Sequence, residues 1–211
     1  MGMVRPLLTT LAATLLIAQS PGTATLSWRG TARIHAGDPP IDIGVSTHVV
    51  PFVSARSESW LLSEGPGSTR VMTVGRDGGW MERGGRREPM SDSMLIHERQ
   101  QYAIYGLMLL ARRLDPSMME SIAAPPGMTA VRVRHPEAPV TDMIFDGEGR
   151  LVEARNRVGD PEGGGEIDQV FRFSGEIEDD GVRWPRRIDI LQRGKPYFTL
   201  TIDSFDTEAG N

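Results

Sequence analysis

Apolar and polar residues alternate along most of the chain after residue 25. In the segment LSWRGTARIH (26–35), Trp28 falls on the apolar side and Arg29 on the polar side, and IDIGVSTHV (41–49) repeats the pattern. Because successive side chains of a strand point to opposite faces, this period of two predicts antiparallel strands with one face buried. The positions expected to face the core are Leu26, Trp28, Gly30, Ala32, Ile34, Ile41, Ile43, Val45, Thr47 and Val49.

The same alternation predicts about eleven strands, five before and six after a central interruption. RDGG (76–79) and DGEG (146–149) are hairpin turn sequences between such segments. Pro185 lies inside one expected strand and indicates a bulge or a sheet edge there, because proline has no N–H to donate. The strands are expected at residues 26–35, 41–49, 53–62, 68–75, 80–85, 128–135, 140–145, 150–158, 168–177, 181–191 and 197–205.

One segment breaks the strand pattern. IHERQQYAIYGLMLLARRL (96–114) begins polar and becomes apolar on every side between Ile104 and Ala111. Ser91 or Ser93 can accept a hydrogen bond from the first helical turn as an N-cap. A helix that is apolar all round has to be buried, so the pattern predicts an enclosed helix within a β-rich chain.

A second, shorter helix is expected at residues 116–123, with Asp115 as its cap and Pro116 at its first position. The two helices would form an insertion at about residues 91–124. An open sheet of about eleven strands usually curls or closes. We therefore expect a mainly β (α+β) fold, a single strongly curved antiparallel sheet or incomplete β-barrel, whose concave face is covered by the helical insertion.

The first 24 residues have the pattern of a secretory signal peptide. Arg5 and the amino terminus precede an apolar run at residues 7–18, and small residues follow. The run is shorter than the roughly 20 residues needed to span a bilayer. We expect cleavage after Ala24, leaving residues 25–211 as one domain exported to the periplasm of a Gram-negative bacterium. The alternatives are an uncleaved anchor and a disordered N-terminus.

Composition and charge narrow the possible functions. The chain has no cysteine, which rules out disulfides, thiol catalysis and a lipoprotein anchor. Its net charge of −5 argues against nucleic acid as a partner. No phosphate-loop, serine-hydrolase or zinc-protease motif occurs. No cofactor or metal site and no enzymatic activity are therefore predicted, and the histidines, which lack metal-ligand spacing, are His35, His48, His97 and His135.

The C-terminal segment FRFSGEIEDDGVRWPRRIDILQRGKPYFTLTIDSF (171–205) resembles the last strands of the LolA/LolB-like superfamily, and VGRDGGWM (74–81) is similar to the hairpin that precedes its helices. The order of strands, helical insertion and strands also agrees. The resemblance implies an incomplete β-barrel with helices over an apolar hollow that takes up acyl chains. The signal segment and the absence of cysteine resemble the soluble periplasmic carrier rather than the membrane-anchored receptor.

Within such a hollow, helix residues and an adaptable methionine-rich wall would contact the lipid. The expected partners are a lipid or an acylated protein, and possibly an envelope protein; no membrane-spanning segment is expected. Two alternatives stay open: an envelope structural or protein-interaction module in which the same residues pack a filled core, and, third, a hydrolase. The candidate lipid-binding residues are Met94, Tyr102, Tyr105, Met108, Leu109, Met118, Met119 and Met128.

Overall fold

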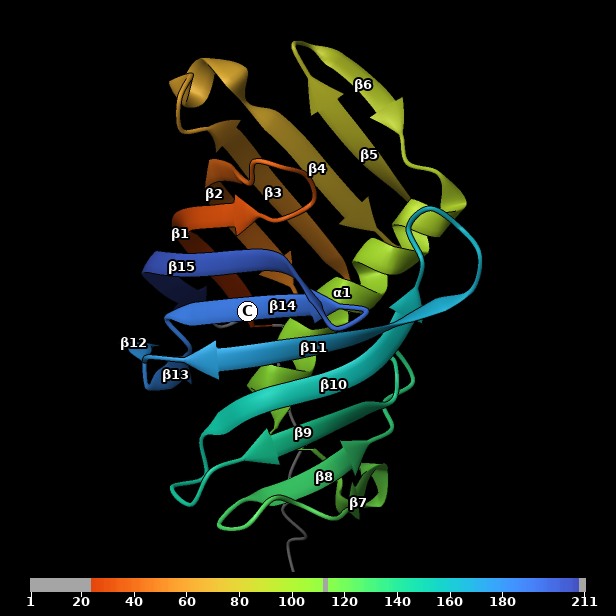
Figure 1. The fold of residues 1–211 in the computed structure, drawn as a ribbon, viewed down its shortest axis with the longest axis vertical. Coiled ribbons are helices and arrows are strands. Elements are labelled where there is room, and N and C mark those ends of the chain that lie inside the picture. Colours follow the sequence, from red (N-terminus) through yellow and green to blue (C-terminus); the bar gives the residue numbers. More distant parts are fainter. Residues whose placement is uncertain (1–23, 112–113, 209–211) are drawn as a thin grey trace, which may run out of the picture.

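The computed structural model describes residues 24–111 and 114–208 (Figure 1). Its helical elements are α1 (Asp92–Leu110) and two 3-10 turns, η1 (Gly65–Ser68) and η2 (Pro116–Met118). The strands are β1 (Thr25–Ile34), β2 (Ile41–Val50), β3 (Ser54–Leu61), β4 (Arg70–Gly75), β5 (Gly78–Arg83), β6 (Arg86–Pro89), β7 (Met119–Ser121), β8 (Thr129–Val133), β9 (Thr141–Phe145), β10 (Leu151–Gly159), β11 (Glu166–Ser174), β12 (Ile177–Asp179), β13 (Val182–Trp184), β14 (Arg187–Gln192) and β15 (Lys195–Glu208).

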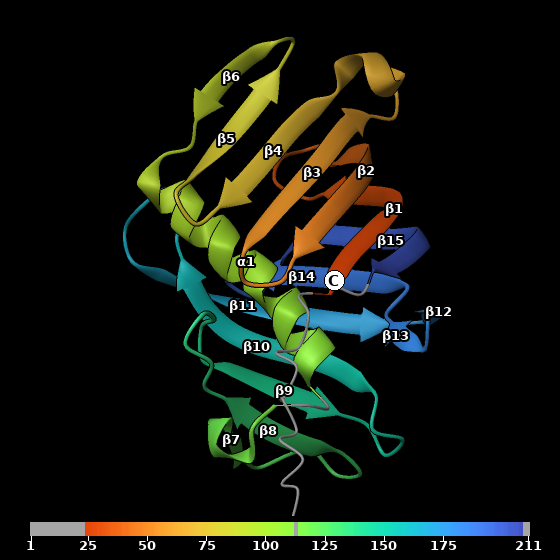
Figure 2. The same cartoon turned by 180° about the vertical axis from the view of Figure 1, so that it is seen from behind.

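One 13-stranded antiparallel sheet forms most of the molecule, in the order β6-β5-β4-β3-β2-β1-β15-β14-β11-β10-β9-β8-β7. β12 and β13 form a separate hairpin. The sheet curves strongly, and its edges β6 and β7 lie at opposite ends of the molecule, so it does not close into a barrel (Figures 1 and 2). The mainly β fold with one curved, incompletely closed sheet, expected from the sequence, is confirmed.

The two halves of the sheet meet where the first strand pairs with the last. Trp28 and Ala32 of β1 lie opposite Phe205 and Leu200 of β15, and all four side chains are buried. The register shifts next to Gly30, where an added Cβ would come 2.0 Å from the Thr201 carbonyl oxygen. Glycine is therefore required at this point for the two backbones to approach. The alternation read from the sequence matches the buried positions of β1 and β2, except that Ile41 is exposed, Ile34 is half-buried and Gly44 is buried.

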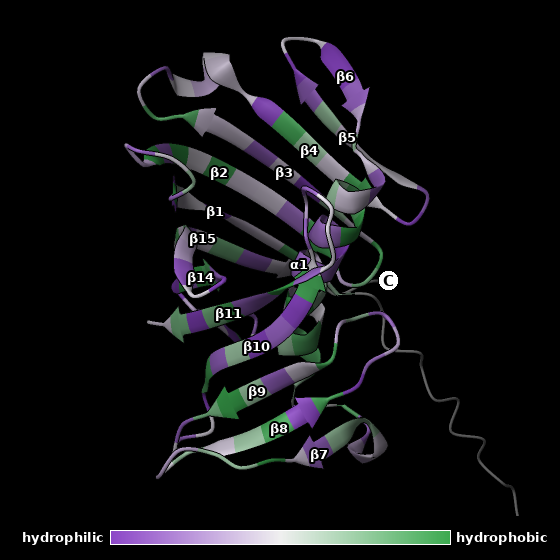
Figure 3. Cartoon of the chain, turned by 45° about the vertical axis from the view of Figure 1, so that its right-hand side comes forward, coloured by the Kyte–Doolittle hydropathy of each residue, from purple (hydrophilic) through white to green (hydrophobic). Residues whose placement is uncertain are grey.

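The helix α1 lies across the concave face of the sheet, between the two curved halves (Figures 2 and 3). Ser91 is its N-cap, with Oγ accepting a hydrogen bond from Met94 N at 3.3 Å. Five consecutive residues, 103–107, are buried, which one packed face cannot achieve. The loop between β2 and β3 supplies the additional cover, because Phe52 packs against Gly106 so closely that a Cβ there would lie 2.5 Å from the ring. The predicted enclosure of this helix is confirmed.

The prediction of a second helix at residues 116–123 is wrong. Asp115 does act as a cap, with Oδ1 accepting from Ser117 N at 2.8 Å, but the helical turn ends at Met118. From Met119 the chain forms β7, which pairs with β8 through Met119 and Val133. A short helix is unfavourable because its first turn is costly to nucleate. The edge of β8, in contrast, has unpaired backbone groups with which this segment forms hydrogen bonds as a strand.

More strands are present than the sequence indicated. The short strands β6, β7 and β12 were not expected, and each has only three or four residues, too few for an alternating pattern to be recognised. The expected strand 181–191 divides at Pro185, with β13 ending before it and β14 beginning after it. The proline thus ends pairing in the small hairpin and lets the chain turn into the main sheet.

The predicted signal peptide falls on residues that lie, except for Ala24, outside the described part of the chain. Within residues 24–111 and 114–208, no helix is long and apolar enough to cross a membrane.

Candidate ligand-binding site

The concave face differs in character along the length of α1. Toward the N-terminal half of the helix, the side chains of His97 and Glu98 are buried although both are ionisable. Toward the C-terminal half, Ile104 and Leu107 are buried in the core, and the half-buried residues 108–111 pack against it. The surface between helix and sheet therefore has a polar end and an apolar end.

An aromatic cluster forms the floor of the apolar end. Tyr105 is 5% exposed, and its ring centroid lies 4.9 Å from that of Trp28 and 6.1 Å from that of Trp184. Trp184 also stacks on Phe205 at 5.1 Å. Tyr105 is thus a structural part of the core, so it is a poor probe of binding even though it was expected to contact a ligand.

The eight residues proposed as lipid contacts from the sequence have three different environments. Tyr105 is buried, while Met128 is 39% exposed, in the loop before β8. The remaining six are half-buried, and four of them, Tyr102, Met108, Leu109 and Met119, pack against the core. Met94 lies in the first turns of α1, and Met118 ends η2.

Further half-buried apolar residues around the core were missed by the sequence reasoning. On the sheet, Met72 of β4 faces inward beside the buried Val74, two residues away. The alternation of β4 carries this signal, but it does not tell a fully buried side chain from one at the margin of the core. The half-buried residues of this kind are Leu61, Met72, Met90, Leu95, Val131, Phe145, Leu151 and Phe198.

A row of polar side chains crosses the inner face of the C-terminal half of the sheet. Asn156 of β10 pairs with Thr141 of β9 and with Gln169 of β11, which in turn pairs with Gln192 of β14. Thr141, Asn156 and Gln169 are buried. Gln169 Nε2 donates to Gln101 Oε1 of α1 at 3.1 Å, so the row meets the polar end of the helix.

Several atoms of this polar row have no hydrogen-bond partner among the described residues. These atoms are Oδ1 and Nδ2 of Asn156 and Oε1 of Gln169. A buried amide without a partner costs about 1–3 kcal/mol, so the row favours additional polar groups or water at this place. Its members are far apart in the sequence, and no local pattern revealed it.

His97 belongs to the same polar end, and its surroundings favour the neutral imidazole. Burial lowers its pKa, because the imidazole is fully enclosed. Its Nδ1 lies 2.8 Å from the Gly159 carbonyl oxygen, so Nδ1 carries the proton and donates. Gln100 fixes the same strand end by accepting from Gly159 N at 2.6 Å. These contacts attach α1 to β10.

Glu98 is the unusual group of the site. It is 8% exposed, and its Oε2 has no hydrogen-bond partner among the described residues. Burial raises its pKa to about 7, and the charge of Arg70 on β4 opposes that rise. Within the described ranges no three His, Asp or Glu side chains lie close enough to hold a metal ion.

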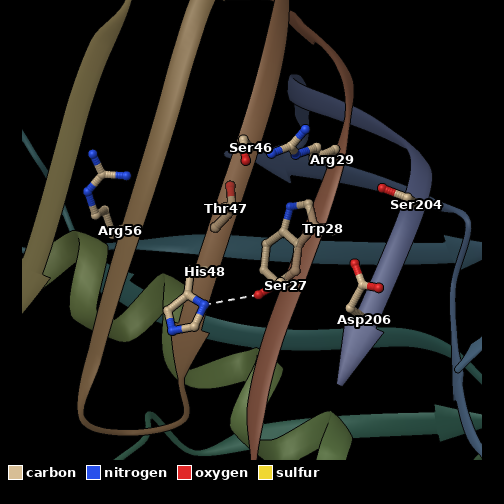
Figure 4. Close-up of a pocket in the computed structure, with 9 residues that line it drawn as sticks. All are labelled: Ser27, Trp28, Arg29, Ser46, Thr47, His48, Arg56, Ser204 and Asp206. Atoms are coloured by element: carbon tan, nitrogen blue, oxygen red, sulfur yellow. Dashed lines mark hydrogen bonds between the residues drawn. The ribbon is translucent and has the colours of Figure 1, made fainter. Parts of the chain in front are cut away.

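The opposite, convex face carries an open pocket of about 400 Å³, in which a serine is hydrogen-bonded to a histidine (Figure 4). Ser27 Oγ and His48 Nδ1 lie 2.9 Å apart. In a catalytic triad a carboxylate orients the imidazole. Here Asp206 of β15 and His48 of β2 lie opposite Ser27 on either side of β1. The aspartate is therefore two strands from the histidine, roughly 10 Å away at normal strand spacing. Ser27 and His48 therefore lack the carboxylate behind the imidazole that a catalytic triad needs to activate its serine.

Three solved structures share this fold. A domain of a proposed outer membrane lipoprotein-sorting protein from Vibrio parahaemolyticus has a TM-score of 0.53 and 8% identity, covering 92% of this chain and 88% of that chain. A DUF1329 family protein from Desulfovibrio piger has a TM-score of 0.55 and 11% identity over 90% and 88%. A LolA superfamily protein from Nitrosomonas europaea has a TM-score of 0.53 and 11% identity over 88% and 86%.

These likenesses define the class of the molecule: it has the LolA-like fold, an incomplete barrel with a helix on its concave face. The resemblance seen in residues 171–205 is thereby confirmed at the level of the fold. No protein-family model matches the sequence, and no curated protein is similar to it.

Proposed function

We propose that the protein is a periplasmic, non-catalytic binder or carrier of lipid or acyl-bearing molecules, which it holds between α1 and the concave face. Half-buried apolar side chains along the C-terminal half of α1 carry this proposal. Met108 and Leu109 pack against the core on one side and keep accessible apolar surface on the other. Covering such surface contributes about 25 cal/mol per Å², which favours an apolar ligand there.

The open sheet supports the same function. Because β6 and β7 do not pair with each other, the concave face is not enclosed by a closed ring of strands. The likeness to a lipoprotein-sorting domain and to a LolA superfamily protein agrees with a carrier. A signal peptide ending at Ala24 would place the mature chain in the periplasm, where its partners would be lipids or acylated proteins.

Replacing Leu109 by alanine tests the position of the ligand. We expect about tenfold weaker binding of a fluorescent fatty acid, because the change removes about 1–2 kcal/mol of apolar contact. Fluorescence titration of the mature chain measures this. The matched control is Leu62→Ala, which makes the same change on the convex face at a residue 49% exposed and should leave affinity unchanged. Equal affinity of Leu109→Ala and the parent would place the ligand elsewhere.

Native mass spectrometry of the mature chain, purified from a periplasm without detergent, tests binding itself. We expect a lipid or acylated peptide at near one-to-one stoichiometry. An apo mass that stays unchanged after incubation with lipids would contradict the carrier function. That result would favour an envelope module with a filled core and a protein partner.

A further inference from the structure

Glu98 is a buried residue of α1, and its charge raises the pKa of nearby tyrosines. Burial raises the pKa of Tyr102 and Tyr105 on α1 and of Tyr197 on β15, and the carboxylate of Glu98 raises each further. Among the described residues, the cation that lowers the pKa of Glu98 is Arg70, an exposed residue of β4. The carboxyl group therefore sits in the interior of the protein, where its charge affects three tyrosines.

Within residues 24–111 and 114–208, no group donates a hydrogen bond to the buried oxygen of this carboxyl group. Oε2 of Glu98 has no partner among these residues, and the side chain is 8% exposed. An ionised carboxylate buried without a partner loses several kcal/mol of hydration. A residue that only filled space here would be more favourable as glutamine or leucine.

A buried acceptor without a protein donor, such as Oε2 of Glu98, is typical of a binding site in which the ligand supplies the hydrogen bond. A positively charged donor compensates a buried carboxylate better than a neutral one, because the pair is also attracted by charge. The polar row lies on the same concave face and contacts α1 at Gln101, and its atoms on Asn156 and Gln169 without a partner among the described residues could accept or donate to a polar ligand head.

The helix gives the direction of such a ligand. Leu109 lies eleven residues beyond Glu98 along α1, which is about 16 Å at the rise of an α-helix. Between these two residues the helix surface changes from polar to apolar. An amphiphile with its head at Glu98 would therefore have its chain along residues 104–110.

We propose that Glu98 binds the primary ammonium head of an amphiphile whose alkyl or acyl chain lies along the apolar C-terminal half of α1. The inference rests on the proposed function and specifies its ligand class. The ammonium group can belong to an aminophospholipid or to a simple alkyl amine, and both would present the same N–H donors to the carboxylate.

Binding of three amphiphiles of equal chain length tests the inference. Dodecylamine carries a charged donor at pH 8, dodecyltrimethylammonium carries the charge without an N–H, and dodecanoate carries the opposite charge. We expect the full mature chain to bind dodecylamine about tenfold more tightly than either of the others in calorimetric titrations, because only dodecylamine combines a positive charge with N–H groups that can donate to the carboxylate. Glu98→Gln should reduce that preference to about twofold or less, whereas Glu64→Gln, an exposed exchange, should retain it.

The outcomes separate the inference from the proposed function. Equal binding of all three amphiphiles, weakened alike by Leu109→Ala, would overturn the role of Glu98 and leave the carrier function standing. A preference for dodecylamine that survives in Glu98→Gln would also overturn it. Binding of none of them would contradict both. Lysophosphatidylethanolamine compared with lysophosphatidylcholine then shows whether a lipid head is accepted as well as a simple amine.

Discussion

Glu98→Gln is expected to remove a contribution of about 3 kcal/mol by which the ionisation of Glu98 lowers the stability of the parent protein between pH 4 and pH 8. The pKa of Glu98 is about 7 in the folded protein, against a reference value of 4.5. Below pH 4.5 the carboxyl group is protonated in both states, and it does not disfavour folding. As the pH rises toward 7, the unfolded chain ionises while the folded protein retains the proton, so the free energy of unfolding falls.

Urea denaturation of both proteins at pH 4 and pH 8 measures this contribution as a double difference. The comparison removes the influence of His97, whose lowered pKa acts in the opposite direction by decreasing stability as the pH falls below its reference value of 6.5. Glu64→Gln is the matched exposed control and should follow the parent. The same pH dependence in Glu98→Gln and in the parent would show that Glu98 ionises as freely when folded as when unfolded.

Trp184→Ala is expected to lower the free energy of unfolding by about 3–5 kcal/mol, as for other buried aromatic side chains. Its ring stacks on Phe205, and its centroid lies 6.4 Å from that of Trp28 and 6.1 Å from that of Tyr105. Removing it would leave a cavity where β13, β15, β1 and α1 meet. Its buried Nε1 has no hydrogen-bond partner among the described residues, so packing accounts for the expected loss.

Trp80→Ala is the control for that experiment, measured by the same urea denaturation. Trp80 is 38% exposed, and the Arg87 guanidinium lies 4.4 Å from the centroid of its ring. A cation–π contact at an exposed site contributes about 0.5–1 kcal/mol, so this variant should lose no more than that. Similar losses in Trp80→Ala and Trp184→Ala would mean that the aromatic cluster does not hold the core together.

The expected stability gain at Glu98 gives the proposed site a physical signature. A group that destabilises the folded protein at neutral pH, and that a single substitution would relieve, fits a residue retained for binding. Trp184 shows the opposite case, because stability alone explains its burial. The two variants therefore separate a functional residue from a structural one on the same concave face.

The sequence by itself determined the local elements of this protein. Alternation predicted the strands and the inward side chains Trp28 and Val45, and the two candidate caps Ser91 and Ser93 marked the start of α1, because strand periodicity and helix capping depend on near neighbours. The apolar run 104–111 even required an enclosed position for the helix. Local pattern could not exclude a helix where Met119 pairs with β8, since only the neighbouring strand decides between the two.

The tertiary structure decided the site. Glu98 looked like an ordinary polar residue of a helix, and it became a buried carboxyl only because β4 and β15 lie around that turn of α1. The polar row from Thr141 to Gln192 depends on the registers of four strands. Such groups are brought together by pairing between segments distant in the chain, and the environment that sets a side chain's charge is created by that packing rather than by its neighbours in sequence.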